Sequence, residues 1–355
     1  MMTKGQKKIR VIASRAGGAG KKRAEKLTLA EWINTWFETY SKPLIRPSTA
    51  KAYQSFIKNH IIPNIGDNSL SGLEPIDIQK MYNSIKTTGR VQTNPRKARR
   101  DWDSNNAGNE GQSLSSGLVR SVHSLLLQCL EQAVRNRLIT YNPVSSCKPP
   151  PKEKSEMRII PSDKIGAYLK AADECGFLPM FFLELSSGLR RGELLALLWS
   201  DLDAADNTIS ITKQVTGTKG GLVVSAPKTP NSIRVIAIPE QATELLSIEH
   251  AKHPNNPYMF PSPVTGKMYY PDSVGRIHKR ILVKAGLEKN RFHDLRHTFS
   301  TLALQNGVDI KTLSNMLGHY SAGFTLDTYT HVTDKVQREA AKKVGSFMKQ
   351  ATGAI

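Results

Sequence analysis

Five side chains in the second half of the sequence have the chemistry to act together on a phosphate group. They are Arg190, His293, Arg296, His319 and Tyr329. Guanidinium and imidazole groups stabilise the charge that develops on the non-bridging oxygens of a phosphodiester, and a phenol supplies an oxygen nucleophile. This combination indicates an attack on a phosphodiester in which fixed cations replace a metal ion.

Three local patterns contain these side chains. They are Ser187-Gly188-Leu189-Arg190-Arg191-Gly192-Glu193-Leu194, then His293-Asp294-Leu295-Arg296-His297, then Leu317-Gly318-His319 followed by Thr328-Tyr329-Thr330-His331. His319 lies 23 positions after Arg296 (319 − 296), and Tyr329 lies ten positions after His319 (329 − 319). In order and spacing the patterns resemble the tyrosine recombinases, also called the phage integrase family, over most of residues 160–335.

The resemblance implies a defined reaction. Members of the family cut each DNA strand by attack of a tyrosine hydroxyl, leave a 3′-phosphotyrosine link and a free 5′-hydroxyl, and reseal by the reverse reaction. Because the covalent link conserves the bond energy, the resemblance implies no metal, no cofactor and no ATP. The implied catalytic residues are Arg190, Lys228, His293, Arg296, His319 and the nucleophile Tyr329.

The residues around Arg190 predict how its guanidinium is oriented. We expect Arg190 to begin a helix that follows Gly188 and runs to Leu198, with Glu193 three residues later on the same face. The alternative is an ordinary surface ion pair. The family's arginine directly follows Gly-Leu, so the resemblance selects Arg190 over Arg191.

His293 and Arg296 lie three positions apart on a helix predicted over residues 294–305. Both side chains therefore point to one side of the helix and can reach one phosphate. His297, four positions after His293, raises the alternative of half a zinc site. The pattern lacks the adjacent glutamate of a metalloprotease motif, so we interpret His297 as a packed or supporting residue.

His319 should be presented by a turn after a helix predicted over residues 310–317. Gly318 can adopt the left-handed conformation that ends a helix and turns the chain sharply. The alternative is that His319 only caps this helix. The resemblance instead expects a donor to the scissile phosphate at this position.

Tyr329 is expected in a short helix, where its phenol needs nearby cations or a base, because its ordinary pKa is about 10. Tyr320 is the rival nucleophile. The family's Thr-Tyr-x-His-Val pattern matches Thr328 to Val332, which favours Tyr329.

Lys228 lies in Ala226-Pro227-Lys228-Thr229-Pro230-Asn231-Ser232, a turn expected between two strands. Most lysines in turns only solvate the surface. This one matches the hairpin lysine of the family, which implies that it reaches the DNA and protonates the departing 5′-oxygen.

The composition indicates a polyanionic partner. The 355-residue chain has 50 Lys and Arg against 30 Asp and Glu, a net charge of +20, with 39% hydrophobic residues. Nucleic acid fits better than a membrane, because no apolar run approaches the roughly 20 residues that span a bilayer, and the N-terminus lacks a signal-peptide segment. The three cysteines, Cys129, Cys147 and Cys175, lack a metal-type spacing, which favours a reducing bacterial cytoplasm.

The first half of the chain is predicted to be helical. A capping box at Thr28-Leu29-Ala30-Glu31 begins the first helix. A second helix follows Ser48 and ends before Pro63, a third follows Leu73, and the longest covers residues 118–138. Residues 27–146 are therefore expected to form an all-α domain, similar to the family's SAM-like core-binding domain, which grips the duplex.

Basic residues in this half are candidates for DNA contact. Residues 1–26 predict a flexible basic arm, which either solubilises the chain or binds DNA. Residues 87–113 are predicted to form a loop that is longer than the family's usual connection. Its basic residues either contact DNA or belong to a solvated surface loop, which is the favoured interpretation. The candidate DNA-binding side chains are Arg46, Lys51 and Lys58 near the second helix, and Arg96, Lys97, Arg99 and Arg100 in the loop.

The second half is expected to be a mixed, mainly helical α+β catalytic domain with a small antiparallel sheet. A proline-containing linker over residues 147–161 precedes it, and the domain itself covers residues 162–334. Strands are predicted around Ile209 and Ile211, over 222–224 and over 233–238. Residues 335–355 predict a C-terminal helix and tail with an apolar stripe formed by Val336, Ala340, Val344, Phe347 and Met348.

The chain is therefore interpreted as a site-specific DNA recombinase, the integrase of a phage or an integrative conjugative element. The resemblance implies double-stranded DNA attachment sites, a homotetramer on DNA and accessory DNA-bending or excision factors, in association with the nucleoid and without a membrane. One alternative is a chromosome-dimer resolvase of the same family, which usually lacks the basic arm and the long loop. A type IB topoisomerase and a non-catalytic DNA-binding protein are the others.

Overall fold

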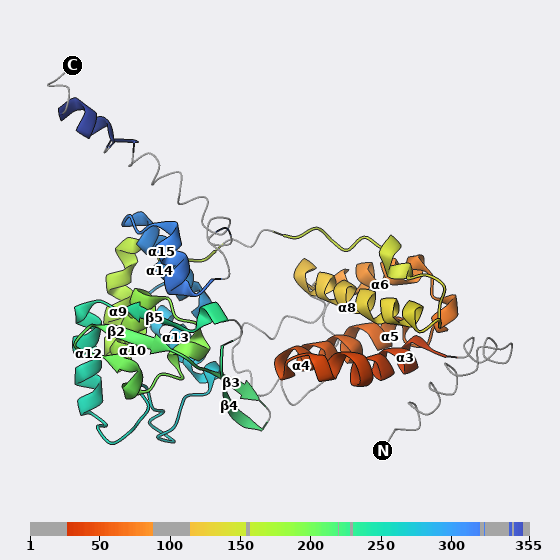
Figure 1. Cartoon of the computed structure of the whole chain (residues 1–355), viewed down its shortest axis with the longest axis horizontal. Helices are drawn as coiled ribbons and strands as arrows, with labels where there is room; N and C mark the ends of the chain where they lie inside the picture. Colours follow the sequence, from red (N-terminus) through yellow and green to blue (C-terminus); the bar gives the residue numbers. More distant parts are fainter. Residues whose placement is uncertain are drawn as a thin grey trace. The chain divides into compact units, whose positions relative to one another are not determined.

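The structure is a computed structural model that describes residues 27–87, 114–153, 157–218, 220–227, 230–319, 323, 341–342 and 344–350. The chain divides into two compact units, Met1–Ser155 and Glu156–Ile355, both drawn in Figure 1. In its described part the first unit consists of helices, whereas the second combines helices with two small antiparallel sheets. The fold class predicted from the sequence is confirmed.

The first unit is held together by apolar faces of its helices, which pack around Trp32. Trp32 is fully buried, and its indole Nε1 donates to the backbone oxygen of Cys129 at 3.0 Å, which connects α3 to α8. The predicted capping box at Thr28 and Glu31 is confirmed by reciprocal hydrogen bonds of 3.2 and 3.3 Å. The elements are α3 (Leu29–Trp36), η1 (Phe37–Ser41), η2 (Lys42–Leu44), α4 (Pro47–Phe56), η3 (Ile57–Ile61), α5 (Ile62–Ile65), η4 (Leu70–Gly72), α6 (Pro75–Thr87), α8 (Ser116–Arg135) and η5 (Pro143–Ser146).

The second helix, α4, ends at Phe56, before Pro63 as predicted, but further helical turns follow it up to Ile65, directly before Gly66. The π-helix η3 changes the hydrogen-bond spacing after α4, and Pro63 then lies in the first turn of α5, where a missing N–H costs little. The long helix α8 is also shifted, because the Ser115 side chain accepts from the Leu118 N–H at 3.3 Å and caps it two residues earlier than predicted.

The segment between the units is anchored at both ends. On the first unit, Lys148 exchanges two backbone hydrogen bonds of 3.0 and 3.2 Å with the Gln79 amide. On the second unit, Ile160 is buried and its N–H donates to the Thr298 hydroxyl at 3.0 Å. The division between Ser155 and Glu156 lies between these anchors, within residues 147–161.

The second unit places a three-stranded sheet, in the order β1-β2-β5, among its helices (Figure 1). Ile209 of β2 pairs with Ile236 of β5, and both side chains are buried against the helices. A separate hairpin joins β3 and β4. The elements are η6 (Ser162–Lys164), α9 (Ile165–Glu174), α10 (Leu178–Ser187), α11 (Arg191–Leu194), η7 (Trp199–Asp201), β1 (Leu202–Asp203), β2 (Thr208–Ile211), β3 (Gln214–Thr218), β4 (Gly221–Ser225), η8 (Pro230–Ser232), β5 (Arg234–Ala237), α12 (Glu240–Ala251), α13 (Pro271–Lys284), α14 (Phe292–Gln305) and α15 (Ile310–Leu317).

Strands β2, β4 and β5 confirm the three strands predicted from the sequence, but β1 and β3 were not predicted. β1 has two residues, which is too short for an alternating pattern. β3 contains Gly217 and mostly polar residues, so only its pairing with β4 makes it a strand. Among the described residues, no helix is long and apolar enough to cross a membrane.

A buried polar chain crosses the core of the second unit. The fully buried ring of His278 on α13 lies 2.8 Å from the Tyr168 hydroxyl and 2.7 Å from the side-chain oxygen of Asn290. The neutral ring satisfies both partners when Nε2–H donates to Asn290 and Nδ1 accepts from Tyr168. Burial lowers the pKa of His278 to about 4, against the hydrogen bond of Asn290, which raises it.

We expect His278 to make the second unit sensitive to mild acid. The unfolded chain binds the proton near pH 6.5 and the folded chain only near pH 4, so stability is complete above 6.5 and falls as the pH drops through this window. The loss should approach about 3 kcal/mol. Hydrogen exchange of α13 peptides, measured in urea at pH 7.5 and 5.0, checks this. His278→Gln should have a smaller loss than the natural chain, and an equal loss in both would contradict the prediction.

Candidate active site

A left-handed glycine turns the chain between α10 and the first candidate arginine. α10 ends at Ser187, and Gly188 follows with φ of 60°. A Cβ at Gly188 would lie 2.3 Å from Cδ1 of Phe299 on α14, so glycine is required for both the backbone conformation and the close approach. The turn brings the segment after α10 directly against α14.

The sequence predicted that Arg190 begins a helix. In the structure Arg190 lies just outside the helix. Its backbone is extended, with φ of −71° and ψ of 142°, and it is the N-cap of the short helix α11, which ends at Leu194 and not at Leu198. The reason is Glu193, whose carboxylate accepts from the backbone N–H of Arg190 at 3.0 Å. This hydrogen bond stabilises the extended conformation of the cap residue.

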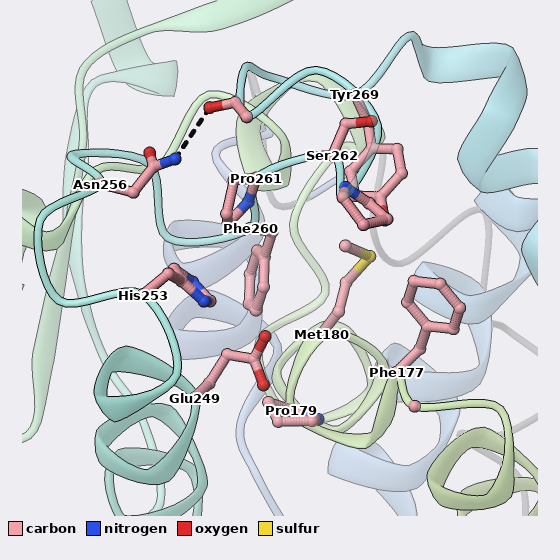
Figure 2. A pocket seen from close by; sticks show the side chains of 13 residues that line it. Phe177, Pro179, Met180, Glu249, His253, Asn256, Phe260, Pro261, Ser262 and Tyr269 are labelled. Carbon is pink, nitrogen blue, oxygen red and sulfur yellow. Dashed lines mark hydrogen bonds between the residues drawn. The ribbon is translucent and has the colours of Figure 1, made fainter.

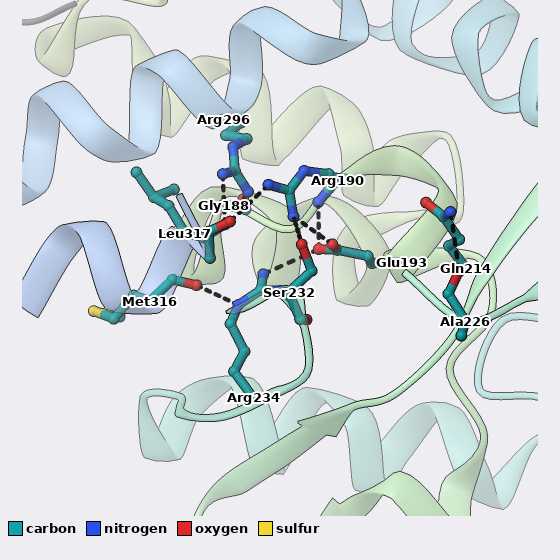
Figure 3. Close-up of polar contacts among 11 residues, drawn as sticks. Gly188, Arg190, Glu193, Gln214, Ala226, Ser232, Arg234, Arg296, Met316 and Leu317 are labelled. Atoms are coloured by element: carbon teal, nitrogen blue, oxygen red, sulfur yellow. Dashed lines mark hydrogen bonds and ion pairs between the residues drawn. The ribbon is translucent and has the colours of Figure 1, made fainter. Parts of the chain in front are cut away.

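The Glu193 carboxylate joins two guanidinium groups (Figure 3). Its Oε1 accepts from Arg190 Nη1 at 2.7 Å, and its Oε2 accepts from Arg234 Nη2 at 3.0 Å. Burial alone would raise the pKa of Glu193, but the hydrogen bonds and charges of Arg234 and Arg190 lower it. Glu193 is therefore ionised and orients Arg190, as the sequence predicted, while Arg234 is a partner that the sequence did not indicate.

Arg296 is almost completely buried and donates to backbone oxygens. Nη1 donates to Gly188 and Nη2 donates to Leu317, both at 2.6 Å (Figure 3). Burial, and next the charge of Arg190, lower the pKa of Arg296 to about 9, so it stays protonated at neutral pH. Its position is fixed by the C-terminal ends of α10 and α15, because both acceptors belong to these ends.

His319 follows the second left-handed glycine. Gly318 has φ of 61° at the end of α15, whose bounds agree with the predicted helix. Its carbonyl accepts from Arg190 Nη2 at 2.9 Å, so His319 lies directly after an anchor of the first arginine. Burial, followed by the charges of Arg296 and Arg190, lowers the pKa of the half-buried His319 to about 3.

His293 lies in the first turn of α14, three residues before Arg296. The ring reaches solvent, yet the surrounding protein lowers its pKa to about 4, first by partial desolvation and then through His297 and Arg296. The His293 and His297 rings lie 5.1 Å apart, edge to face. Within the described ranges, no group of three or more His, Cys, Asp or Glu side chains is arranged to hold a metal ion.

This arrangement is suited to binding a phosphodiester. Arg190 and Arg296 provide positive charge on fixed supports, and at neutral pH His293 and His319 are uncharged imidazoles that can donate or accept a hydrogen bond. A bound phosphate would accept hydrogen bonds from the N–H groups of these side chains. Hydrogen bonds through Gly188 and Gly318 and mutual charge effects connect the segments that carry the four side chains. That they serve one site stays a prediction.

Two catalytic candidates, Lys228 and Tyr329, lie outside the described residues, as does the rival Tyr320. The same holds for residues 1–26 and for the four basic candidates Arg96, Lys97, Arg99 and Arg100. Arg46, Lys51 and Lys58 are described and exposed along α4 and η3. Their contact with DNA stays a prediction.

Three polar residues near the arginines were missed by the sequence analysis. Ser232 is buried, and its hydroxyl accepts from Arg190 at 3.4 Å. Arg234 was interpreted only as part of a strand. Glu184 on α10 is completely buried, and neither of its carboxylate oxygens has a hydrogen-bond partner. The signal for Glu184 was available, since a single acid interrupts the apolar run Met180-Phe181-Phe182-Leu183-Glu184-Leu185.

A separate cavity of about 350 Å³ lies between α10, α12 and the segment that follows α12 (Figure 2). Phe177, Met180, Phe260 and Tyr269 contribute apolar surface, and Glu249 contributes a carboxylate. None of the catalytic candidates that the structure describes lines this cavity. Their guanidinium and imidazole groups therefore lie outside this pocket.

Comparison with known families supports the resemblance seen in the sequence. A sequence profile described as "Phage integrase family" matches residues 158–336, and one described as "Phage integrase, N-terminal SAM-like domain" matches residues 28–86. Both profiles match in the order expected for the family. They cover the described core of the second unit and, in the first unit, the helices α3, α4, α5 and nearly all of α6.

Individual relatives agree with the profiles. A tyrosine recombinase XerC-like protein of Caldanaerobacter subterraneus subsp. tengcongensis is 25% identical over 352 residues, covering 90% of this chain and 83% of the relative. The ICEBs1 integrase of Bacillus subtilis is 28% identical over 248 residues, covering 66% of this chain and 67% of the relative. In fold, the chain is similar to a Tn1549 transposon integrase bound to transposon right end DNA, with a TM-score of 0.72, 17% identity and coverage of 90% and 100%. A lambda integrase tetramer bound to a Holliday junction gives a TM-score of 0.62 at 19% identity, with coverage of 89% of this chain and 85% of the integrase chain.

We expect Glu184→Gln to stabilise the second unit increasingly as the pH rises. Burial raises the pKa of Glu184, against the charge of Arg296, so the folded chain keeps the proton that the unfolded chain loses above about pH 4.3. The natural chain therefore has its full stability below pH 4.3 and loses up to about 1.4 kcal/mol per pH unit above it. Glutamine has nearly the same shape and does not titrate.

The measurement is the free energy of unfolding of both chains between pH 4 and 8. The difference between them should grow with pH. A difference that stays constant across this range would mean that Glu184 ionises normally in the folded protein.

Proposed function

Because the chain belongs to the phage integrase family, we propose that it cuts and rejoins double-stranded DNA through a covalent link to Tyr329. The chain is a tyrosine-type site-specific recombinase, and its relatives include integrases of mobile elements. The observation that supports the proposed mechanism is the pair of anchored guanidiniums, Arg190 and Arg296, beside the uncharged imidazoles of His293 and His319.

In the proposed reaction one bond to phosphorus forms and another breaks. The Tyr329 oxygen attacks phosphorus, and its proton passes to a base, for which the neutral ring of His293 is available. The bond between phosphorus and the 5′-oxygen breaks, and Lys228 gives this oxygen a proton. The products are a 3′-phosphotyrosine and a free 5′-hydroxyl, and the reverse reaction joins a new 5′-hydroxyl.

Arg190, Arg296 and His319 would stabilise the charge on the non-bridging oxygens during attack. Bound phosphate brings a negative charge next to His293 and His319, which raises the pKa of both rings above their values in the free protein. The site therefore gains donors as the substrate arrives. Removal of one such donor typically slows an enzyme by about 10²- to 10³-fold.

We further propose that residues 27–146 grip the duplex, that residues 162–334 cut it, and that residues 147–161 link the two. Arg46, Lys51 and Lys58 on α4 and η3 are proposed contacts to the DNA backbone. The basic residues 1–26 and 87–113 extend this electrostatic attraction. A bacterial, nucleoid-associated enzyme with a DNA-bending or excision factor fits these roles.

Assembly as a tetramer on paired attachment sites is proposed from the C-terminal segment. Val344, Phe347 and Met348 are 61%, 66% and 54% exposed. This exposure supports a role of the predicted apolar stripe in assembly. Val336 and Ala340, the remainder of the stripe, lie outside the described residues. A neighbouring protomer would bury the stripe, and the lambda integrase neighbour was solved as a tetramer.

Tyr329→Phe should bind DNA with unchanged affinity yet form no covalent complex, because only the nucleophilic oxygen is removed. A denaturing gel with a labelled attachment-site duplex detects the protein-linked strand. Tyr320→Phe is the matched control and should keep the link. A linked strand from Tyr329→Phe would show that another residue attacks.

Lys228→Ala should slow cleavage of an ordinary phosphodiester by about 10²- to 10⁴-fold, the usual contribution of a general acid. A substrate with sulfur at the 5′-bridging position should be slowed far less, because the thiolate leaves without a proton. Single-turnover rates on both substrates measure the contrast. Equal slowing on the two substrates would assign Lys228 to DNA binding alone.

A further inference from the structure

Arg234, the first residue of β5, has a buried guanidinium whose three nitrogens all donate hydrogen bonds. Nε donates to the Met316 carbonyl at 2.6 Å, Nη1 to the Ser232 carbonyl at 3.0 Å, and Nη2 to the Glu193 carboxylate at 3.0 Å. The side chain is only 7% exposed. Figure 3 shows it beneath Arg190, between the ends of α11 and α15.

Each acceptor belongs to a segment that carries a proposed catalytic residue. Glu193 directly orients Arg190 through a second hydrogen bond of 2.7 Å. Ser232 lies four positions after Lys228 in the turn that leads into β5, and its hydroxyl also accepts from Arg190 at 3.4 Å. Met316 lies in the last turn of α15, three positions before His319.

The glycine that ends α15 makes room for this guanidinium. A Cβ at Gly318 would lie 3.1 Å from Nη1 and 3.3 Å from Cδ of Arg234, tighter than ordinary contacts. Arg234 therefore packs closely against the left-handed turn that directly precedes His319.

Exposure and hydrogen bonds also distinguish Arg234 from Arg190, one of the two proposed phosphate ligands. Arg190 is 34% exposed and still presents part of its guanidinium outward, whereas Arg234 uses its nitrogens on protein acceptors and faces the interior. A planar fork with donors in three directions is required here. A lysine has a single ammonium on a flexible stem and cannot reach three separate acceptors in the same geometry.

We propose that Arg234 is a positioning residue. It holds Arg190, the Lys228 turn and His319 in the relative positions, here called their register, that strand cleavage needs. The proposal rests on the recombinase function proposed above. Arg234 acts through its neighbours and does not contact the scissile phosphate. Loss of this register should affect the chemical step and leave DNA affinity intact, because misplacement of reacting groups by about 1 Å already costs about 10²-fold in rate.

The test uses Arg234→Lys and Arg234→Met in the full chain. Both variants should form covalent complex about 10²-fold more slowly than the natural chain at saturating attachment-site DNA, while the dissociation constant changes by less than about threefold. Lys213→Met is the matched control. It removes a cation from another ion pair of the same unit, the 2.6 Å pair with Asp201, and should leave the cleavage rate near that of the natural chain.

A salt titration then distinguishes a positioning residue from a phosphate ligand. Loss of one phosphate contact lowers the slope of log affinity against log salt by about one. Arg190→Met should have this lower slope, and Arg234→Met should keep the slope of the natural chain. A lower slope for Arg234→Met would overturn the proposal, since it would place Arg234 on the DNA.

A double-mutant cycle tests whether Arg234 acts through Arg190. Arg190→Lys and Arg234→Lys should together slow cleavage clearly less than the product of their separate effects, because both disturb the same guanidinium. Fully multiplicative effects would overturn the proposal. So would an unchanged cleavage rate in folded Arg234→Lys, with folding checked by thermal unfolding beside Lys213→Met.

These outcomes remain separate from the proposed function itself. If the natural chain formed no covalent complex, the recombinase mechanism would fail, whatever Arg234 does. If the natural chain cleaves and the Arg234 variants cleave equally well, only the positioning role fails. Arg234→Met serves as the second variant for each readout, so that a folding defect of one substitution does not decide the result.

Discussion

Mutual repulsion of three guanidinium groups is the constraint on which the catalytic unit depends. The charges of Arg190 and Arg234 both lower the pKa of the buried Arg296. The positive charge is balanced in part by the Glu193 carboxylate. Ser232 accepts from Arg234 through its carbonyl and from Arg190 through its hydroxyl. The remaining partners are the carbonyl oxygens of Gly188, Met316, Leu317 and Gly318. These oxygens lie at the C-terminal ends of α10 and α15, where the helix dipole is negative, so the helix ends themselves stabilise the cations.

The two left-handed glycines have a direct consequence for the site. Gly188 and Gly318 each end a helix and turn its last carbonyls toward the arginines. A side chain at either position would strain the backbone and press on Phe299 or Arg234. The acceptors are therefore backbone atoms on rigid elements. Such donors and acceptors need little reorganisation when charge develops on a substrate, which is the basis of electrostatic catalysis.

The sequence predicted those features that depend on local patterns. α15 has the predicted bounds, Gly318 is left-handed as expected, and Glu193 orients Arg190. It failed where hydrogen bonds within a segment decide a helix boundary. Arg190 is an extended cap because its backbone N–H donates to Glu193, and helical turns continue past Pro63 after the π-helix η3.

The missed residues of the site have a common physical reason. Arg234 stands in a short strand, where an arginine is usually a solvated residue, and it is buried only because α15 and α11 meet over β5. Glu184 and Glu193 differ in their partners. Glu193 bonds two arginines and has a lowered pKa, whereas neither carboxylate oxygen of Glu184 has a hydrogen-bond partner and its pKa is raised. If Glu184 ionised, it would cancel more of the positive charge. Its raised pKa disfavours that compensation, and a phosphodiester anion can balance the remaining positive charge.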